Sequence, residues 1–222
     1  KKKKTSQHGA TTENAKKYID FAAENGIQGL LVEGWNTGWD QWINTDDREG
    51  VFDFITPYPD YDFDEVMAYA KDKGVEVIMH HETSAAPLTY EKQMEAAYDF
   101  MKANDINSVK TGYVGEIIPK GEYHHGQWMV KHYQKVLDET AKKEIAVNAH
   151  EPIKATGKRR TYPNAIAREG LRGQNLMLGP QTVVTHPHTC QQSPSPECFL
   201  ALLILRLVFS KLNLMIIKRE IA

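Results

Sequence analysis

Cysteine is scarce in this 222-residue sequence, which contains Cys190 and Cys198 and no others. Two cysteines support neither a disulfide framework nor a cysteine-rich zinc site. Positive charge is limited as well, since 27 Lys and Arg stand against 29 Asp and Glu. Basic residues gather mainly at residues 1–4 and 158–160. Nucleic acid is therefore not an expected partner.

Long apolar runs are also rare. The first residues carry none, so the sequence as it stands shows no signal peptide. The apolar stretch at residues 198–217 approaches the length of a membrane span, but Arg206 and Lys211 interrupt it, and we expect no membrane insertion. A hydrophobic content of 41% is nevertheless typical of a folded protein. The chain is long enough for one large domain or for part of a larger one.

Helical and strand-like patterns alternate four times along the chain. Apolar residues at helical spacing follow the capping residues Thr11 and Asp62, and further helices are predicted around residues 90–101 and at 127–142. Short apolar runs predict strands at residues 29–32, 75–79, 108–113 and 145–147. Helices that alternate with continuously apolar strands are typical of parallel βαβ units.

Two architectures fit this order of elements: a doubly wound sheet and a (β/α)8 TIM barrel. Polar residues follow several different strands, whereas no glycine-rich loop follows the first one. That distribution favours the barrel, whose sites are built from many strand ends. Four strands make half of a barrel, so we predict a partial (β/α)8 TIM barrel of about four βα units within residues 1–174. The outer edges of its terminal strands would then be unpaired.

The most informative polar residues stand where two of the predicted strands end. The strand at 145–147 leads into Asn-Ala-His-Glu at 148–151, and the strand at 75–79 leads into His-His-Glu at 80–82. A carboxylate beside an imidazole is suited to proton transfer. Because the carboxyl ends of parallel strands meet at one face of a barrel, both groups can reach one substrate.

Five short segments carry a resemblance to a known family. They are His-Gly-Ala-Thr-Thr-Glu-Asn at 8–14, Val-Glu-Gly-Trp-Asn at 32–36, His-His-Glu-Thr at 80–83, Lys-Thr-Gly-Tyr-Val at 110–114 and Asn-Ala-His-Glu at 148–151. In this order they resemble glycoside hydrolase family 97. The resemblance runs from about Gln7 to Gln174 and covers roughly the middle of the family's catalytic (β/α)8 barrel.

The resemblance implies a function as well as a fold. Family members are calcium-dependent α-glucosidases and related enzymes, so the implied activity is hydrolysis of terminal α-glucosidic bonds in oligosaccharides and other α-glucosides. Calcium is the implied cofactor. Members are largely exported to the periplasm of Gram-negative bacteria, which implies a periplasmic or secreted location.

The resemblance places catalytic roles on two carboxylates. Glu82 and Glu151 match the pair that positions and deprotonates the attacking water in inverting members. Inversion needs a base and an acid far enough apart to admit that water. Gly112 stands near the Asp nucleophile of retaining members, so the glycine favours the inverting branch.

The resemblance also implies a sugar site and a metal site. The residues that would contact the sugar are Trp35, His80, Lys110 and His150. Imidazole and ammonium groups suit sugar hydroxyls, and an indole suits the face of a sugar ring. Glu151 and Glu169 match calcium ligands, and Ca²⁺ prefers carboxylate oxygens.

The general acid of the family is missing. It would be a Glu six residues after Glu169, where this sequence has Asn175. An amide cannot donate a proton to a leaving oxygen. We therefore expect the chain as given to be inactive.

Two alternatives remain on the residues alone. One is another metal-dependent TIM-barrel isomerase or hydrolase, with a transition metal on His80, Glu82, His150 and Glu151, because imidazole suits zinc or manganese. The other is a non-functional pseudogene fragment.

Residues 175–222 differ in character from the rest of the chain. Restoring one G between the codons of Gln174 and Asn175 would yield Gln-Glu, and the new frame allows strings that resemble the family sequence beyond its acid. We hypothesise a single-base deletion, in the gene or in its sequencing, which makes 175–222 an out-of-frame tail without a place in the fold. Resequencing the coding DNA across Gln174 tests this, and an intact frame there would refute it.

Overall fold

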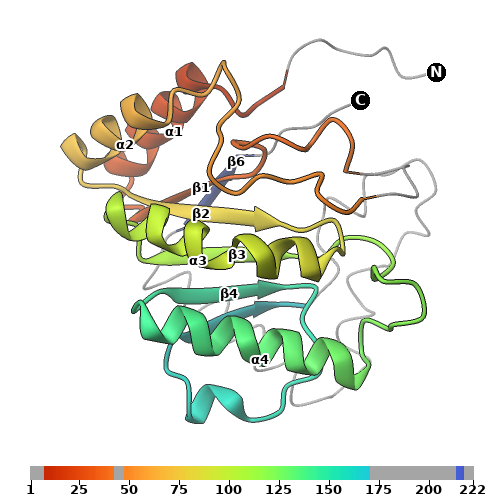
Figure 1. The fold of residues 1–222 in the computed structure, drawn as a ribbon. Helices are drawn as coiled ribbons and strands as arrows, with labels where there is room; N and C mark the ends of the chain where they lie inside the picture. The colour runs from red at the N-terminus through yellow and green to blue at the C-terminus, as the bar shows by residue number, and fades with distance from the viewer. Residues whose placement is uncertain (1–7, 43–47, 171–213, 218–222) are drawn as a thin grey trace, which may run out of the picture.

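A computed structural model of the protein describes residues 8–42, 48–170 and 214–217. In these residues α-helices alternate with strands that form one sheet (Figure 1). The helices are α1 (Thr12–Glu24), α2 (Phe63–Asp72), α3 (Pro87–Ala103) and α4 (Gln127–Lys142), with a short 3-10 helix η1 (Lys158–Arg160). The strands are β1 (Gly29–Val32), β2 (Glu76–Glu82), β3 (Ser108–Gly112), β4 (Ala146–His150), β5 (Ala165–Glu169) and β6 (Leu214–Ile217).

Side-chain caps begin the first two helices, as the sequence predicts. Thr11 Oγ1 accepts a hydrogen bond from the backbone N–H three residues later at 3.3 Å, and Asp62 Oδ1 does the same at 2.9 Å. A glycine follows the end of each helix: Gly26 after α1, with a φ of 67°, and Gly74 after α2, with a φ of 68°. That left-handed conformation turns the chain back toward the next strand.

The strands are parallel and lie in the order β5-β4-β3-β2-β1-β6. From β1 to β5 each strand neighbours the next one in the sequence. Figure 1 shows α3 and α4 together across the middle of the sheet, and α1 with α2 beside the β1 end. Consecutive parallel strands with helices between them are the arrangement of half a (β/α)8 barrel, so the predicted architecture is confirmed.

All four predicted strands are present, and β5 is an addition. Its sequence, Ala-Ile-Ala-Arg-Glu, has little of the apolar run that marks the other strands. It pairs with β4 through a register shift between Val147 and Asn148. Tertiary pairing, rather than local propensity, makes this segment a strand.

The strand β6 departs from the expectation that residues 175–222 have no place in the fold. Its backbone pairs with the whole of β1, from Gly29 opposite Leu214 to Val32 opposite Ile217. The β1 edge, predicted to be unpaired, is therefore occupied. An open edge presents a row of N–H and C=O groups with which an extended segment can pair. Asn175 and the rest of this region lie outside the described residues.

The main hydrophobic core lies between the helices and the sheet. It includes Ile19 of α1, Val66 of α2 and the α3 residues Tyr90 and Met101, all at most 1% exposed. No helix in the described parts of the chain is long and apolar enough to cross a membrane.

Candidate active site

Two carboxylates at the ends of β2 and β4 are held by consecutive backbone amides. The N–H of Val114 donates to Glu82 Oε1 at 3.0 Å, and the N–H of Tyr113 donates to Glu151 Oε2 at 2.8 Å. The N–H of Ser84 donates to the same Glu82 oxygen at 2.8 Å. The residues that follow β3 thus bring together the two carboxylates that the sequence proposes as catalytic.

Burial makes both carboxylates hard to ionise. It raises the pKa of Glu82 to about 8, the charge of Glu151 adds to the effect, and the two amides that bond Glu82 oppose it. Burial also raises the pKa of Glu151, against the hydrogen bond from Tyr113. A base whose pKa lies near the working pH combines a usable ionised fraction with good proton affinity.

Lys110 forms ion pairs with carboxylates from strands on both sides of β3. Its side chain is fully buried, and its Nζ lies 3.0 Å from Glu33 Oε1 and 2.9 Å from Glu169 Oε2. Glu33 directly follows β1 and Glu169 ends β5, each two strands away from β3. Two strand spacings amount to about 10 Å in a flat sheet, so curvature of the sheet helps both carboxylates reach one ammonium. Burial alone would lower the pKa of Lys110, but Glu33 and Glu169 outweigh it and raise that pKa.

Two histidines face the same site. His80 is 2% exposed, and neither ring nitrogen has a hydrogen-bond partner in the described parts of the chain. Burial lowers its pKa to about 3, so the ring is neutral at pH 7. His150 Nε2 lies 3.2 Å from Glu151 Oε1 and 3.5 Å from Glu169 Oε1. Buried polar atoms without partners are costly, so the His80 nitrogens are suited to bonding the hydroxyls of a ligand.

The two predicted calcium ligands both lie beside the ring of His150. Both Glu151 and Glu169 direct an oxygen toward His150 Nε2. Carboxylate oxygens suit Ca²⁺, which takes six to eight ligands. Within the described residues, however, no group of three or more His, Cys, Asp or Glu is arranged to hold a metal. The oxygens of Glu151 and Glu169 have the chemistry that Ca²⁺ prefers, but the described residues complete a ligand set neither for calcium nor for the transition-metal alternative on His80, Glu82, His150 and Glu151.

Trp35 does not lie where a sugar ring could pack on it. Its side chain is 2% exposed, and its Nε1 donates to the His80 carbonyl at 3.0 Å. The indole ring lies 5.5 Å from the Phe63 ring and stacks on Phe100 at 6.4 Å. Trp35, predicted to contact the sugar, is therefore a core residue that supports the backbone of His80. In the core the indole buries more apolar surface than it would on the face of a sugar ring.

Several residues of the site have no predicted role. Glu33 could have been found from its position directly after β1, which repeats that of Glu82 at the end of β2. The backbone of Glu151 has a φ of 43°, and its carbonyl accepts hydrogen bonds from Tyr133 Oη at 2.6 Å and His124 Nε2 at 2.5 Å. Tyr133 and His124 thus hold Glu151 in a conformation that is strained for a residue other than glycine. No sequence pattern marks that role.

Comparisons with known proteins identify the family of the chain. A family model, Glycoside hydrolase 97, matches residues 1–171. The chain belongs to glycoside hydrolase family 97. The membership and the partial barrel predicted from the sequence are thereby confirmed.

The solved structures of this family include similar chains. A family 97 enzyme from Pseudoalteromonas sp. strain K8, in complex with acarbose, is 48% identical with a TM-score of 0.70, over 78% of this chain and 27% of that one. A variant from the same strain, in complex with panose, gives the same identity and TM-score.

The curated relatives are more distant. A probable retaining alpha-galactosidase from Streptomyces bingchenggensis is 25% identical, over 82% of this chain and 26% of its own length. A retaining alpha-galactosidase from Bacteroides thetaiotaomicron is also 25% identical, over 76% of this chain and 22% of its own length. The chain thus spans about a quarter of the length of its relatives.

Replacing Lys110 with methionine should destabilise the fold strongly, since Glu33 would be left buried without its cation. We expect Lys110→Met to lower the free energy of unfolding by about 3–5 kcal/mol, and Glu33→Gln in the same chain to restore part of that loss. Urea denaturation measures both. The control is Lys71→Met, which removes an exposed ion pair with Asp105 and should change little. Equal effects of the two lysine substitutions would refute the role of Lys110.

The pKa of Glu82 predicts how stability depends on pH. Its value of about 8 lies above the ordinary 4.5, so the folded protein keeps a proton that the unfolded chain loses. The contribution of Glu82 to stability should therefore be full below about pH 4.5 and be lost as the pH rises toward 8, by on the order of a few kcal/mol. Buried His80, whose pKa is lowered to about 3, contributes in the opposite direction, so the test is a difference between two proteins. Urea midpoints measured across this pH range, in buffers that contain a chelator, should show the stability advantage of the protein over Glu82→Gln decreasing as the pH rises. The difference from the control Glu76→Gln, exposed at the other end of β2, should stay constant.

Proposed function

We propose that the protein is a calcium-dependent, exo-acting glycoside hydrolase that cleaves terminal α-glucosidic bonds with inversion. Its family and the polar groups at the ends of β1 to β5 support a glycosidase. The Pseudoalteromonas enzyme, which binds the oligosaccharides acarbose and panose, is 48% identical, whereas the alpha-galactosidases are 25% identical. That difference favours a glucoside over a galactoside substrate.

The observation that carries the proposal of inversion is the contact between Gly112 and Glu82. A side-chain carbon at Gly112 would overlap Glu82 Oε2 and lie 3.0 Å from the Glu82 carboxyl carbon. Glu82 is buried and its other oxygen, Oε1, accepts two backbone N–H groups, so a shift of the carboxylate would disturb these hydrogen bonds. This arrangement favours Gly over an Asp nucleophile at position 112 and so supports the inverting mechanism. The site instead suits a carboxylate that activates water.

In this mechanism Glu82 and Glu151 orient the attacking water and take its proton. The water oxygen bonds to the anomeric carbon from one side while the glycosidic C–O bond breaks on the other, which inverts the configuration. His80, His150 and Lys110 would bind the hydroxyls of the sugar and fix its orientation.

The leaving oxygen needs a proton from a general acid, and this step is where the chain as given would fail. The expected position holds Asn175, which lies outside the described residues. Glu151 and Glu169 would hold the calcium ion together with further oxygen ligands that the described residues do not supply. The ion would act as a Lewis acid and stabilise negative charge on an oxygen.

The experiment is an assay of two proteins, the chain as given and a version with the frame repaired so that Glu stands at position 175. The substrates are aryl α-glucoside and aryl α-galactoside, each with calcium and with a chelator. We expect the repaired protein to cleave the glucoside in a calcium-dependent way and to release the β-anomer first, observed by NMR. The unrepaired chain should show no turnover.

Glu82→Gln in the repaired protein should lower kcat by about 10²-fold or more, because the base is lost. Lys92→Gln, a change at an exposed position on α3, is the matched control. Release of the α-anomer first, or a preference for galactoside, would overturn the proposed stereochemistry or specificity. Turnover by the unrepaired chain would overturn the assignment of the acid.

A further inference from the structure

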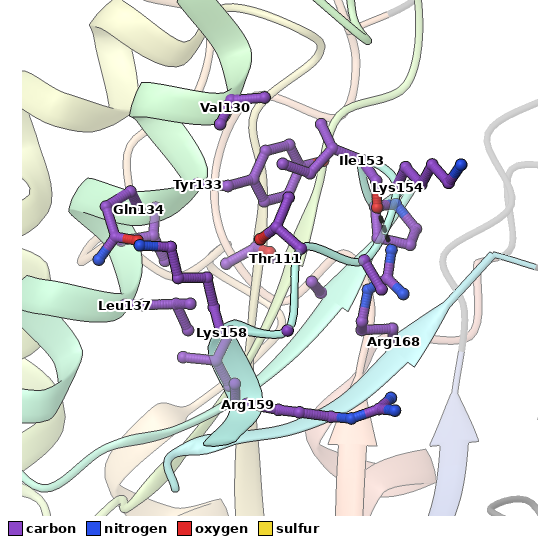
Figure 2. Close-up of a pocket in the computed structure, with 18 of the residues that line it drawn as sticks. Thr111, Val130, Tyr133, Gln134, Leu137, Ile153, Lys154, Lys158, Arg159 and Arg168 are labelled. Atoms are coloured by element: carbon purple, nitrogen blue, oxygen red, sulfur yellow. Dashed lines mark hydrogen bonds between the residues drawn. The ribbon is translucent and has the colours of Figure 1, made fainter. Parts of the chain in front are cut away.

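Within the described parts of the chain, the outer face of the sheet carries a groove at β4 and β5 that opens to solvent. The connection between these strands contains η1 instead of an α-helix, so their outer face is less covered than that of β2 or β3. The small side chains of Ala149 and Ala165 leave a hollow there of about 90 Å³. In Figure 2 Tyr133 and Leu137 of α4 border it on one side and Ile153 on the other.

This groove is separate from the candidate active site. Successive side chains of a strand point to opposite faces of the sheet. Val147 and Ala149 line the groove, whereas His150 points to the other face, where it meets Glu169. The groove is also mainly apolar, which suits hydrocarbon better than the hydroxyls of a sugar.

Basic side chains border the groove. Lys158 and Arg159 come from η1, Lys154 from the turn before it and Arg168 from β5 (Figure 2). Arg168 Nη2 donates to the Ile153 carbonyl. Within the described parts of the chain, the residues that line the groove include no Asp or Glu, and the side chains of Lys158 and Arg159 form no ion pair. An apolar hollow with several basic side chains at its edge is complementary to a molecule that is apolar at one end and anionic at the other.

We propose that this groove binds an amphipathic organic anion, namely a carboxylate joined by a short linker to an apolar group about the size of a benzene ring. An enclosed apolar cavity of about 150 Å³ accommodates benzene. A hollow of about 90 Å³ that opens to solvent can take most of such a ring while the linker remains outside. The carboxylate would then lie at the basic edge of the groove that η1 provides.

The size of the groove favours a small molecule over a protein partner. Stable protein–protein interfaces bury about 800 Å² on each side. The groove is bounded by α4 on one side and by the 151–164 connection on the other, and its hollow has room for about one ring. Its charge also opposes a second copy of the same basic edge.

The test is a binding titration of the full chain with 4-phenylbutyrate, followed by ligand-observed NMR. Two probes of the same shape serve as comparisons: neutral 4-phenylbutanamide and cationic 4-phenylbutylamine. We expect the carboxylate to bind at least about fivefold more tightly than either. The measurement uses no turnover, so its result is independent of the proposed hydrolase activity.

Variants locate the binding. The double variant Lys158→Glu/Arg159→Glu reverses exposed charges and should weaken binding of the carboxylate at least about fivefold. The matched control, Lys92→Glu/Lys120→Glu, makes the same change at exposed lysines away from the groove and should leave binding unchanged. Ala165→Leu should fill the hollow and remove binding, with circular dichroism as the check on folding.

Four outcomes would overturn the proposal. They are absence of binding at the solubility limit of the probe, equal affinity for the carboxylate and the amide, equal weakening by the control variant, and a dimer in sedimentation that the groove variant dissociates. The last outcome would assign the groove to a second copy of the chain.

Discussion

The buried ammonium of Lys110 is the interaction on which the arrangement of the site depends. A fully buried cation is unfavourable unless carboxylates surround it, and here Glu33 and Glu169 supply them from β1 and β5. These strands lie on opposite sides of β3. Lys110 therefore favours a curved sheet and also determines which carboxylates meet in the site. The same contact places Glu169 beside His150 and Glu151, where metal ligands are proposed.

The backbone just beyond β3 has an equally central role. Tyr113 and Val114 direct consecutive N–H groups to Glu151 and Glu82, so both carboxylates are positioned by one short segment. That segment is supported from behind, where the Tyr113 hydroxyl meets His132 Nε2 at 3.0 Å. The groove on the outer face borders the same strands, and its residues Ile153 and Arg168 lie close in sequence to Glu151 and Glu169. Site and groove therefore share their supporting backbone.

Much of this arrangement can be predicted from the sequence. Apolar runs and caps such as Asp62 locate the helices and four strands, and carboxylates at strand ends point to the site. The sequence predicts less well those features that depend on packing between residues distant in the chain. The indole of Trp35 is buried in the core, β5 forms by pairing with β4, and the hydrogen bond from Tyr133 to Glu151 depends on how α4 packs on the sheet. Such contacts join residues distant in sequence and leave no periodic pattern.

A side chain at position 112 would occupy the space that the Glu82 carboxylate fills. This limits how the residues at these two positions can change during evolution. An aspartate added at position 112 with Glu82 retained would place two groups in the same space, while loss of Glu82 alone would leave the two amides at Ser84 and Val114 without their acceptor. Under the proposed mechanism, exchange of a water-activating carboxylate for an attached nucleophile would therefore involve substitutions on both of these neighbouring strands. Because a change at one position alone would disturb the packing or the hydrogen bonds of Glu82, we expect the residues at 82 and 112 to change together.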